Sequence, residues 1–375
     1  MKRLGLIVNP VAGIGGRVGL KGSDGEAIVK RAVELGAVKL SPGRAVEALR
    51  RIARIREQVE VITYPGEMGE DEAREAGLQP TVIGSIAHNS TTREDTIEAA
   101  RTMAEMGVDL IMFAGGDGTA RDLVEAVDGD VPVLGIPAGV KIHSGVFAIN
   151  PVDAGELAAL YLEGGPVKLR ELEVMDIDEE AFRDDRLSAR LYGYLKVPYM
   201  EALVQNTKSG SATTDEFSLE GIAADIVEEL ERDILYVLGP GTTVRPIAER
   251  LGLSKTLLGV DVVLNGELVA ADANEEKLLE LIEGKEARII VTVIGGQGFV
   301  FGRGNQQISP QVIRSVGVEN ITIIATPGKL AALQGRPLLV DTGDPEVDNM
   351  LCGYAKVVTE YGRRVVYRVK AGGST

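Results

Sequence analysis

The sequence contains very little cysteine, histidine and aromatic residue. Its 375 residues include one cysteine (Cys352), two histidines (His88 and His143) and no tryptophan, and aromatic residues make up 4%. A single cysteine excludes an intramolecular disulfide and fits a reducing compartment, so we expect a cytoplasmic protein. Two histidines and one cysteine are too few for a His/Cys metal cluster, and we predict no metal ligands in the chain.

Long apolar runs and an excess of positive charge are also missing. No stretch approaches the roughly 18 apolar residues of a membrane-spanning helix, and the apolar run at the N-terminus is too short for a signal peptide. The net charge is −16, which argues against non-specific binding to nucleic acid. We therefore expect no nucleic-acid or membrane partner. Independently of the charge, we expect a homo-oligomer. An anionic substrate would need a local positive site.

The most informative stretch is Gly115-Gly116-Asp117-Gly118-Thr119. The residues before it, 108–113, form a short apolar run typical of a buried strand, and residues 120–127 carry the apolar stripe of a helix. Glycines let a backbone approach a ligand closely, and the free amides at a helix start attract anions. Asp117 would then hold a substrate hydroxyl or a phosphate-bound cation. The alternative is a strand-to-helix turn in which Asp117 only caps the helix.

Strands alternate with helices over the first part of the chain, which predicts a parallel α/β nucleotide-binding domain at 1–150. The expected strands are 3–8, 59–63, 81–84, 108–113 and 131–137, and the expected helices are 45–56, 70–76, 92–106 and 120–127. Residues 151–375 are expected to form a second, mixed α/β domain. Alternatively, the last strands of the chain could pack back onto the first domain.

Polar residues follow several of the other predicted strands. Gly239-Pro240-Gly241-Thr242-Thr243 repeats the strand, glycine turn and helix pattern that holds anions, whereas neither the Walker lysine motif nor G-x-G-x-x-G occurs in the chain. Residues 302–309 place polar side chains among glycines, which is hard to explain as core. Residues 141–145 follow the strand at 131–137. Their histidine, His143, is either a hydrogen-bonded loop residue or a substrate contact.

These motifs carry a resemblance to a known family. Residues 115–119 resemble the signature of the NAD kinase superfamily, which also includes diacylglycerol and sphingosine kinases, and 9–13 resemble its first nucleotide-contacting loop. Residues 135–141 and 302–307 are similar to archaeal and bacterial ATP-NAD kinase-like proteins, with which the acetoin-catabolism X proteins belong. The resemblance implies an active site in the cleft between two domains. It also implies phosphoryl transfer from ATP, or from polyphosphate, to the adenosine-ribose 2′-hydroxyl of NAD with Mg²⁺.

The resemblance also implies roles for individual residues. Asp117 would orient or deprotonate the attacking hydroxyl. The residues expected to bind ATP are Asn9, Gly13, Gly115, Gly116, Gly118, Thr119, Gly241, Thr242 and Thr243. Those expected to bind the acceptor substrate are Asp122, Lys141, His143, Ser144, Asn305 and Gln306.

The sequence departs from orthodox NAD kinases at two motifs. Apart from residues 274–275, at the start of an expected helix, it has no Asn-Glu pair like the one with which they grip the substrate ribose. It also lacks their Thr-Gly-Ser-Thr-Ala segment, for which residues 239–243 are a candidate replacement. Two alternatives therefore stay open. One is a kinase of the same fold that acts on a different small-molecule alcohol, and the other is a non-catalytic protein that binds NAD or nucleotides.

Overall fold

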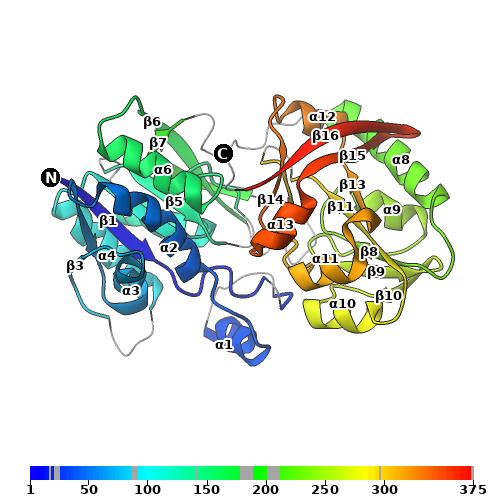
Figure 1. Cartoon of the computed structure of the whole chain (residues 1–375), viewed down its shortest axis with the longest axis horizontal. Helices are drawn as coiled ribbons and strands as arrows, with labels where there is room; N and C mark the ends of the chain where they lie inside the picture. The colour runs from blue at the N-terminus through cyan, green and yellow to red at the C-terminus, as the bar shows by residue number, and fades with distance from the viewer. Residues whose placement is uncertain are drawn as a thin grey trace. The chain divides into compact units, whose positions relative to one another are not determined.

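The chain divides into two compact units (Figure 1). The computed structural model describes residues 1–16, 18–20, 26–86, 91–127, 129, 131–139, 142–177, 189–200, 212–294 and 297–372. Unit 1 comprises Met1–Ile14 and Val38–Thr207, and unit 2 comprises Gly15–Ala37 and Lys208–Thr375. Unit 1 thus continues beyond residue 150, where the sequence placed the domain boundary.

The helices and strands of unit 1 alternate along most of its length. Its strands are β1 (Lys2–Val8), β2 (Val59–Thr63), β3 (Thr81–Val82), β4 (Leu110–Gly115), β5 (Val133–Pro137), β6 (Lys168–Ile177) and β7 (Ala189–Tyr199). Its helices are α2 (Ser41–Ile52), α3 (Glu70–Glu75), α4 (Arg93–Glu105), α5 (Asp117–Ala126) and α6 (Pro151–Leu162), with 3-10 turns η1 (Ala53–Ile55) and η2 (Gly66–Met68).

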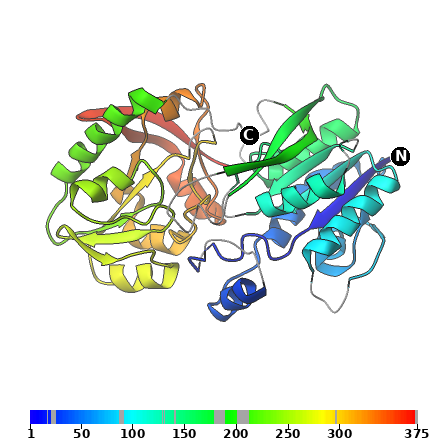
Figure 2. The same ribbon diagram turned by 180° about the vertical axis from the view of Figure 1, so that it is seen from behind.

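The first sheet of unit 1 is parallel and covered on both faces. In the described residues its strand order is β3-β2-β1-β4-β5, and every pairing is parallel. Helices α2 and α6 pack together over one face, and α4 and α5 pack together over the other, as the two opposite views show (Figures 1 and 2). Strand β4 is buried along its whole length, as a central parallel strand should be. The predicted parallel α/β fold is confirmed.

Strands β1 and β4 are neighbours at the point where the strand order reverses. Leu4 of β1 pairs with Val61 of β2 on one side and with Leu110 of β4 on the other. The chain passes from β1 to β2 but from β4 to β5, so successive connections run in opposite directions. In open α/β sheets, ligands bind at the carboxyl ends of the strands at such a switch point. The loops at residues 9–14 and 115–119 both start there.

An antiparallel pair of strands extends unit 1 beyond the parallel sheet. Strand β6 pairs with β7 from Lys168↔Tyr199 to Ile177↔Ala189, and the pair packs against α5 and β5. The approach is close, because a Cβ on Gly193 of β7 would lie 2.7 Å from a methyl carbon of Val124 in α5. The buried residues of β6 and β7 join the core of the first sheet. This packing is why unit 1 includes residues that the sequence assigned to the second domain.

Unit 2 contains α1 (Glu26–Glu34) and most of the chain after residue 207. Its other helices are α8 (Ala212–Glu228), α9 (Arg245–Arg250), α10 (Glu275–Ile282), α11 (Pro310–Val316), α12 (Pro327–Ala331) and α13 (Pro345–Leu351), with the 3-10 turn η3 (Val318–Asn320). Its strands are β8 (Leu235–Leu238), β9 (Asp261–Leu264), β10 (Glu267–Ala270), β11 (Ala287–Thr292), β12 (Phe299–Phe301), β13 (Ile321–Ile324), β14 (Leu338–Val340), β15 (Gly353–Glu360) and β16 (Arg363–Ala371).

The sheet of unit 2 is mixed, which confirms the predicted class of the second domain. Its order in the described residues is β10-β9-β8-β11-β13-β15-β16-β14-β12, with β8, β11, β13 and β15 parallel to one another. Alternate residues face two separate cores: Val237 of β8 belongs to one and Leu238 to the other. The last strands, β15 and β16, lie inside this sheet. None of the described helices is long and apolar enough to cross a membrane.

Candidate functional site

The loops that follow β1 and β4 are hydrogen-bonded to each other. Asn9, directly after β1, donates from its side-chain amide to the hydroxyl oxygen of Thr119, at 3.0 Å. Its side-chain oxygen accepts from the backbone N–H of Val11 at 3.2 Å, and its own backbone N–H donates to the carbonyl of Ala114 at 3.0 Å. Asn9 therefore fixes the first loop against the start of α5. The sequence predicted that Asn9 and Thr119 both bind the nucleotide, and the structure brings these two residues together.

Glycine is required where three turns of unit 1 meet. A Cβ on Gly139 would lie 2.8 Å from the Cα of Gly116, and one on Gly13, where φ is +73°, would overlap the carbonyl oxygen of Ala138. The backbone N–H groups of Ala138 and Gly139 both donate to the carbonyl oxygen of Gly115, at 2.9 and 3.0 Å. The turns after β1, β4 and β5 thus pack backbone against backbone. Where these turns meet, at the beginning of α5, the three glycines present backbone atoms and no side chains.

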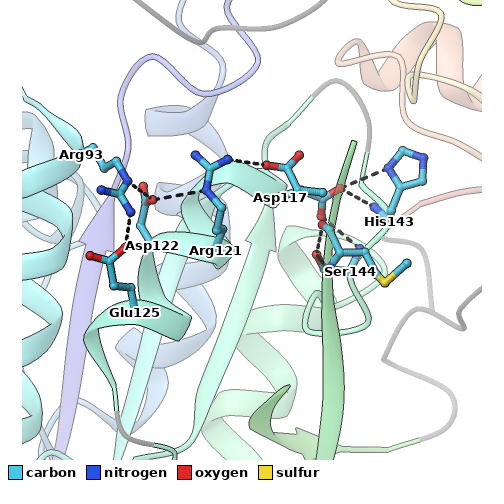
Figure 3. A network of polar contacts seen from close by, with 9 residues as sticks. Arg93, Asp117, Arg121, Asp122, Glu125, His143 and Ser144 are labelled. Atoms are coloured by element: carbon cyan, nitrogen blue, oxygen red, sulfur yellow. Dashed lines mark hydrogen bonds and ion pairs between the residues drawn. The ribbon is translucent and has the colours of Figure 1, made fainter. Parts of the chain in front are cut away.

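Asp117 opens α5, but its carboxylate is bound by a different loop (Figure 3). Oδ1 accepts from the backbone N–H of Ser144 at 3.0 Å, and Oδ2 accepts from the backbone N–H of His143 at 2.7 Å. Ring atom Nδ1 of His143 lies 3.2 Å from the same Oδ2. The residue before Asp117, Gly116, is the N-cap, and no side chain caps the helix. The alternative in which Asp117 merely caps its own helix is therefore wrong.

The loop that binds Asp117 is itself anchored to β6. The Ser144 hydroxyl donates to the carbonyl of Met175 at 2.8 Å and accepts from the N–H of Met175 at 3.0 Å. The backbone N–H of Gly145 donates to the carbonyl of Glu173 at 2.9 Å. The Ser144 side chain, which the sequence assigned to substrate, has its hydrogen-bond partners in β6. Its backbone N–H binds Asp117.

Charged residues farther along α5 form a second network (Figure 3). Arg93 donates to Asp122 at 2.7 Å and also pairs with Glu125, while Arg121 pairs with Asp176 at 3.0 Å. Burial raises the pKa of Asp122 to about 6, although the bond from Arg93 acts in the opposite direction. Asp122, a predicted substrate residue, is thus held by an arginine of α4.

Three of the predicted nucleotide residues follow β8 in unit 2. Gly241 has a φ of +115°, and its N–H donates to the carbonyl of Leu257 at 2.9 Å. Thr242 is exposed, whereas Thr243 is only 1% exposed. The Thr243 hydroxyl has no hydrogen-bond partner among the described residues.

Asn305 and Gln306 lie in the turn after β12, also in unit 2. The Asn305 side chain accepts from the N–H of Gly302 at 3.1 Å and donates to the carbonyl of Val300 at 2.8 Å, so it shapes its own turn. Oε1 of Gln306 is buried without a hydrogen-bond partner in the part of the chain that the structure describes. Lys141, the remaining predicted substrate residue, lies outside the described residues.

The sequence assigned no role to two residues that the structure places at strand ends. Gly139 faces Gly116 across the turns after β4 and β5. The sequence feature that could have identified it is the Pro-Ala-Gly turn at 137–139. Lys329 donates to the hydroxyl oxygen of Thr292 at 3.2 Å and to the carbonyl of Val293 at 3.0 Å, at the end of β11. The sequence feature that could have identified Lys329 is its position directly after Pro327-Gly328, which open α12.

The arrangement in unit 1 can hold an anion beside groups that accept a proton. The first amides of α5 have no partner inside the helix, so they are available to phosphate oxygens, and the helix dipole favours negative charge there. Asp117 and His143 lie at the same end of that helix. Groups of three or more His, Cys, Asp or Glu side chains that could hold a metal ion are absent from the described residues.

Two family models match the chain. The family model of the ATP-NAD kinase N-terminal domain matches residues 4–166, and that of the ATP-NAD kinase C-terminal domain matches residues 232–369. A search of curated proteins gave no match.

Two similar solved structures are candidate diacylglycerol kinases from Bacillus anthracis strain Sterne. One is 16% identical with a TM-score of 0.26, and the match covers 47% of this chain and 45% of that one. The other is 12% identical with a TM-score of 0.26, covering 63% of this chain and 58% of that one. TM-scores this low support no statement about the present chain. The two family models together span most of the sequence, and the chain belongs to the ATP-NAD kinase family.

Proposed function

We propose that this protein is a kinase that transfers the γ-phosphoryl group of ATP to an alcohol, the 2′-hydroxyl of the adenosine ribose of NAD. The observation that carries the proposal is the position of Asp117 at the start of α5, where its carboxylate is held by the amides of His143 and Ser144. A buried carboxylate fixed beside unpaired helix amides suits a reaction that joins a phosphate to a hydroxyl.

The phosphate-binding part of the site is assigned to backbone groups. In the proposal, the amides of Gly115, Gly116, Gly118 and Thr119 bind the triphosphate, and Asn9 fixes the loop beside it. Gly116 and Gly139 let the turns after β4 and β5 pack backbone against backbone, because a Cβ on Gly139 would lie 2.8 Å from the Cα of Gly116, and this packing fixes the start of α5. ATP enters as its Mg²⁺ complex, and the cation offsets the charge on the phosphates.

Within unit 2, Gly241, Thr242 and Thr243 are proposed as nucleotide-binding residues and Gln306 as an acceptor-binding residue. Gly241, Thr242 and Thr243 follow a strand in the same pattern as the first site, and the buried hydroxyl of Thr243 and Oε1 of Gln306 lack partners in the described structure. Unpaired buried polar groups are costly and call for an explanation, which a bound ligand would supply. Asn305 would act by holding its turn in shape.

Catalysis of phosphoryl transfer is mostly positioning and electrostatic stabilisation. The proposed site supplies both, through backbone amides aimed at the phosphates and a carboxylate that is only 5% exposed. Asp117 would orient or deprotonate the attacking hydroxyl.

A second candidate is a kinase of the same fold with a different acceptor. The specific observation in its favour concerns the Asn-Glu pair that grips the ribose in orthodox NAD kinases. The Asn-Glu pair of this sequence, Asn274-Glu275, opens α10, where the Asn274 side chain caps the helix by accepting the N–H of Lys277. A nucleoside, a sugar or a lipid head group would then supply the hydroxyl.

The test is to incubate the purified chain with Mg²⁺, γ-labelled ATP and NAD, and to follow labelled NADP and ADP. We expect the two products in equal amounts. ADP formation only with another alcohol from a parallel acceptor panel would replace NAD by that acceptor. Tight ATP binding by calorimetry without ADP from any acceptor would contradict the kinase assignment, and polyphosphate in place of ATP tests the donor.

A further inference from the structure

We propose that the proton acceptor in this reaction is Nε2 of His143, and that Asp117 is a positioning residue that acts through the ring. The inference rests on the proposed function, because it names the group that accepts the proton at the same site. It differs from the simplest reading of the motif, in which the carboxylate removes the proton itself.

Both oxygens of the Asp117 carboxylate already accept hydrogen bonds from the loop at 143–144. Oδ1 accepts the N–H of Ser144, and Oδ2 accepts the N–H of His143 and faces ring atom Nδ1. With three donors within hydrogen-bond distance and an exposed fraction of 5%, this carboxylate offers a substrate hydroxyl little access. A group so placed is better suited to hold a neighbour than to meet the substrate.

The imidazole of His143 has one nitrogen bound and one available. Nδ1 lies 3.2 Å from Oδ2 of Asp117, and Figure 3 shows the other ring nitrogen directed away from that carboxylate. Nε2 has no hydrogen bond to any of the described residues, and the side chain is 14% exposed. Because a carboxylate only accepts, Nδ1 must carry the proton of the neutral ring, and Nε2 must carry the lone pair.

The backbone around His143 fixes the ring's attachment point. Ser144 makes two hydrogen bonds to Met175 of β6, and Gly145 makes one to Glu173. The carboxylate is equally fixed, because Asp117 is part of α5. The imidazole is therefore attached to one rigid segment and oriented by another, as a general base requires.

The step balances without a further reactant. The acceptor oxygen forms a bond to the γ-phosphorus, and the bond from that phosphorus to the bridging oxygen breaks, with its electron pair leaving on ADP. The hydroxyl proton moves to Nε2, and the positive ring that results is stabilised by the carboxylate of Asp117 on its other side. The imidazolium then returns its proton to water.

Two substitutions separate a base from a positioning group. His143→Asn keeps an N–H donor where Nδ1 stands and removes Nε2, whereas His143→Ala removes both. If Nε2 accepts the proton, both variants lose at least ~100-fold in kcat with little change in the KM for ATP. Added imidazole then restores activity to His143→Ala and leaves the wild type unchanged. If the ring only supports Asp117, His143→Asn keeps most of its activity, which would overturn the inference.

A readout that does not need turnover is the tautomer of the ring. The chain has two histidines, so ¹⁵N spectra of histidine-labelled protein contain two rings, and the His143→Asn variant identifies one of them. We expect the neutral His143 ring to be protonated on Nδ1, and protonation on Nε2 would refute the proposal. Absence of phosphoryl transfer in the wild type would instead remove the proposed function itself, and this inference with it.

Discussion

A buried carboxylate is stable only where donors replace the water it has lost, and Asp117 obtains them from one short loop. Its two oxygens accept backbone N–H groups of consecutive residues, at 2.7 and 3.0 Å. Hydrogen bonds to a charged acceptor are roughly twice as strong as neutral ones. Among the described residues no lysine or arginine lies within ion-pair distance of this carboxylate. The charge of Asp117 is therefore held by peptide dipoles beside the proposed phosphate site.

Glu72 is also a buried acid, but, unlike Asp117, it has a carboxylate oxygen without a donor among the described residues. It is 3% exposed in α3, and one of its carboxylate oxygens, Oε2, has no hydrogen-bond partner within the described structure. Burial, aided by nearby acidic residues, raises its pKa from 4.5 to about 7. Between these two values the folded chain holds a proton that the unfolded chain has released. The free energy of unfolding should therefore fall as pH rises through this window.

The substitution Glu72→Gln removes that titration. We expect the pH dependence of the free energy of unfolding between pH 4.5 and 7 to flatten by about 2–3 kcal/mol. Urea unfolding at a series of pH values measures it. Glu98→Gln, at an exposed position of α4 and not among the acids that shift Glu72, is the control and should keep the wild-type slope. A wild-type slope in Glu72→Gln would show that Glu72 is ionised in the folded protein.

At the scale of elements, local patterns predicted most helices and strands because their burial is periodic. The strand at 59–63 was placed correctly, and the predicted helix at 92–106 is α4, where Thr92 and Asp95 form a capping box. Strand β12 and helix α13 were missed. β12 is only three residues long, and α13 carries two acids in its first turn and little apolar periodicity.

The packing of α2 on α6 gives a prediction about one glycine. A Cβ on Gly155 of α6 would overlap the carbonyl oxygen of Ala48 in α2 and lie 2.8 Å from the Cβ of Arg51. Gly155→Ala should therefore destabilise unit 1 by about 1–3 kcal/mol, despite the better helix propensity of alanine. Thermal unfolding measures the loss. Gly43→Ala in α2 is the matched control, because nothing lies within 4 Å of its added Cβ, and unchanged stability in Gly155→Ala would contradict the close packing.

At the scale of the whole molecule, the sequence predicted the motifs better than their contacts. The 115–119 motif and the 135–145 stretch were both recognised, but the bond between Asp117 and His143 joins positions 26 apart and depends on the pairing of β4 with β5. The same holds for Asn9 and Thr119, which are brought together by the pairing of β1 with β4. Contacts of this kind follow from sheet order, which hydrophobic periodicity does not encode.

The net charge of −16 repels an anionic substrate, so the site has to supply its own local attraction. A nucleotide triphosphate approaches a molecule of its own sign, so attraction has to come from groups close to the binding site. In the proposal the amides at the start of α5 and the cation carried with ATP provide it. Recognition by backbone amides also explains why the motif is rich in glycine and poor in lysine.

The measurement that tests this account most directly compares wild type with Asp117→Asn in the same assay of ADP and NADP formation, alongside calorimetric binding of ATP. The substitution retains the size of the side chain but removes its charge and its hold on the ring. We expect ATP binding to be nearly unchanged and turnover to fall by at least ~100-fold. Full turnover in Asp117→Asn would contradict the central role given to this carboxylate.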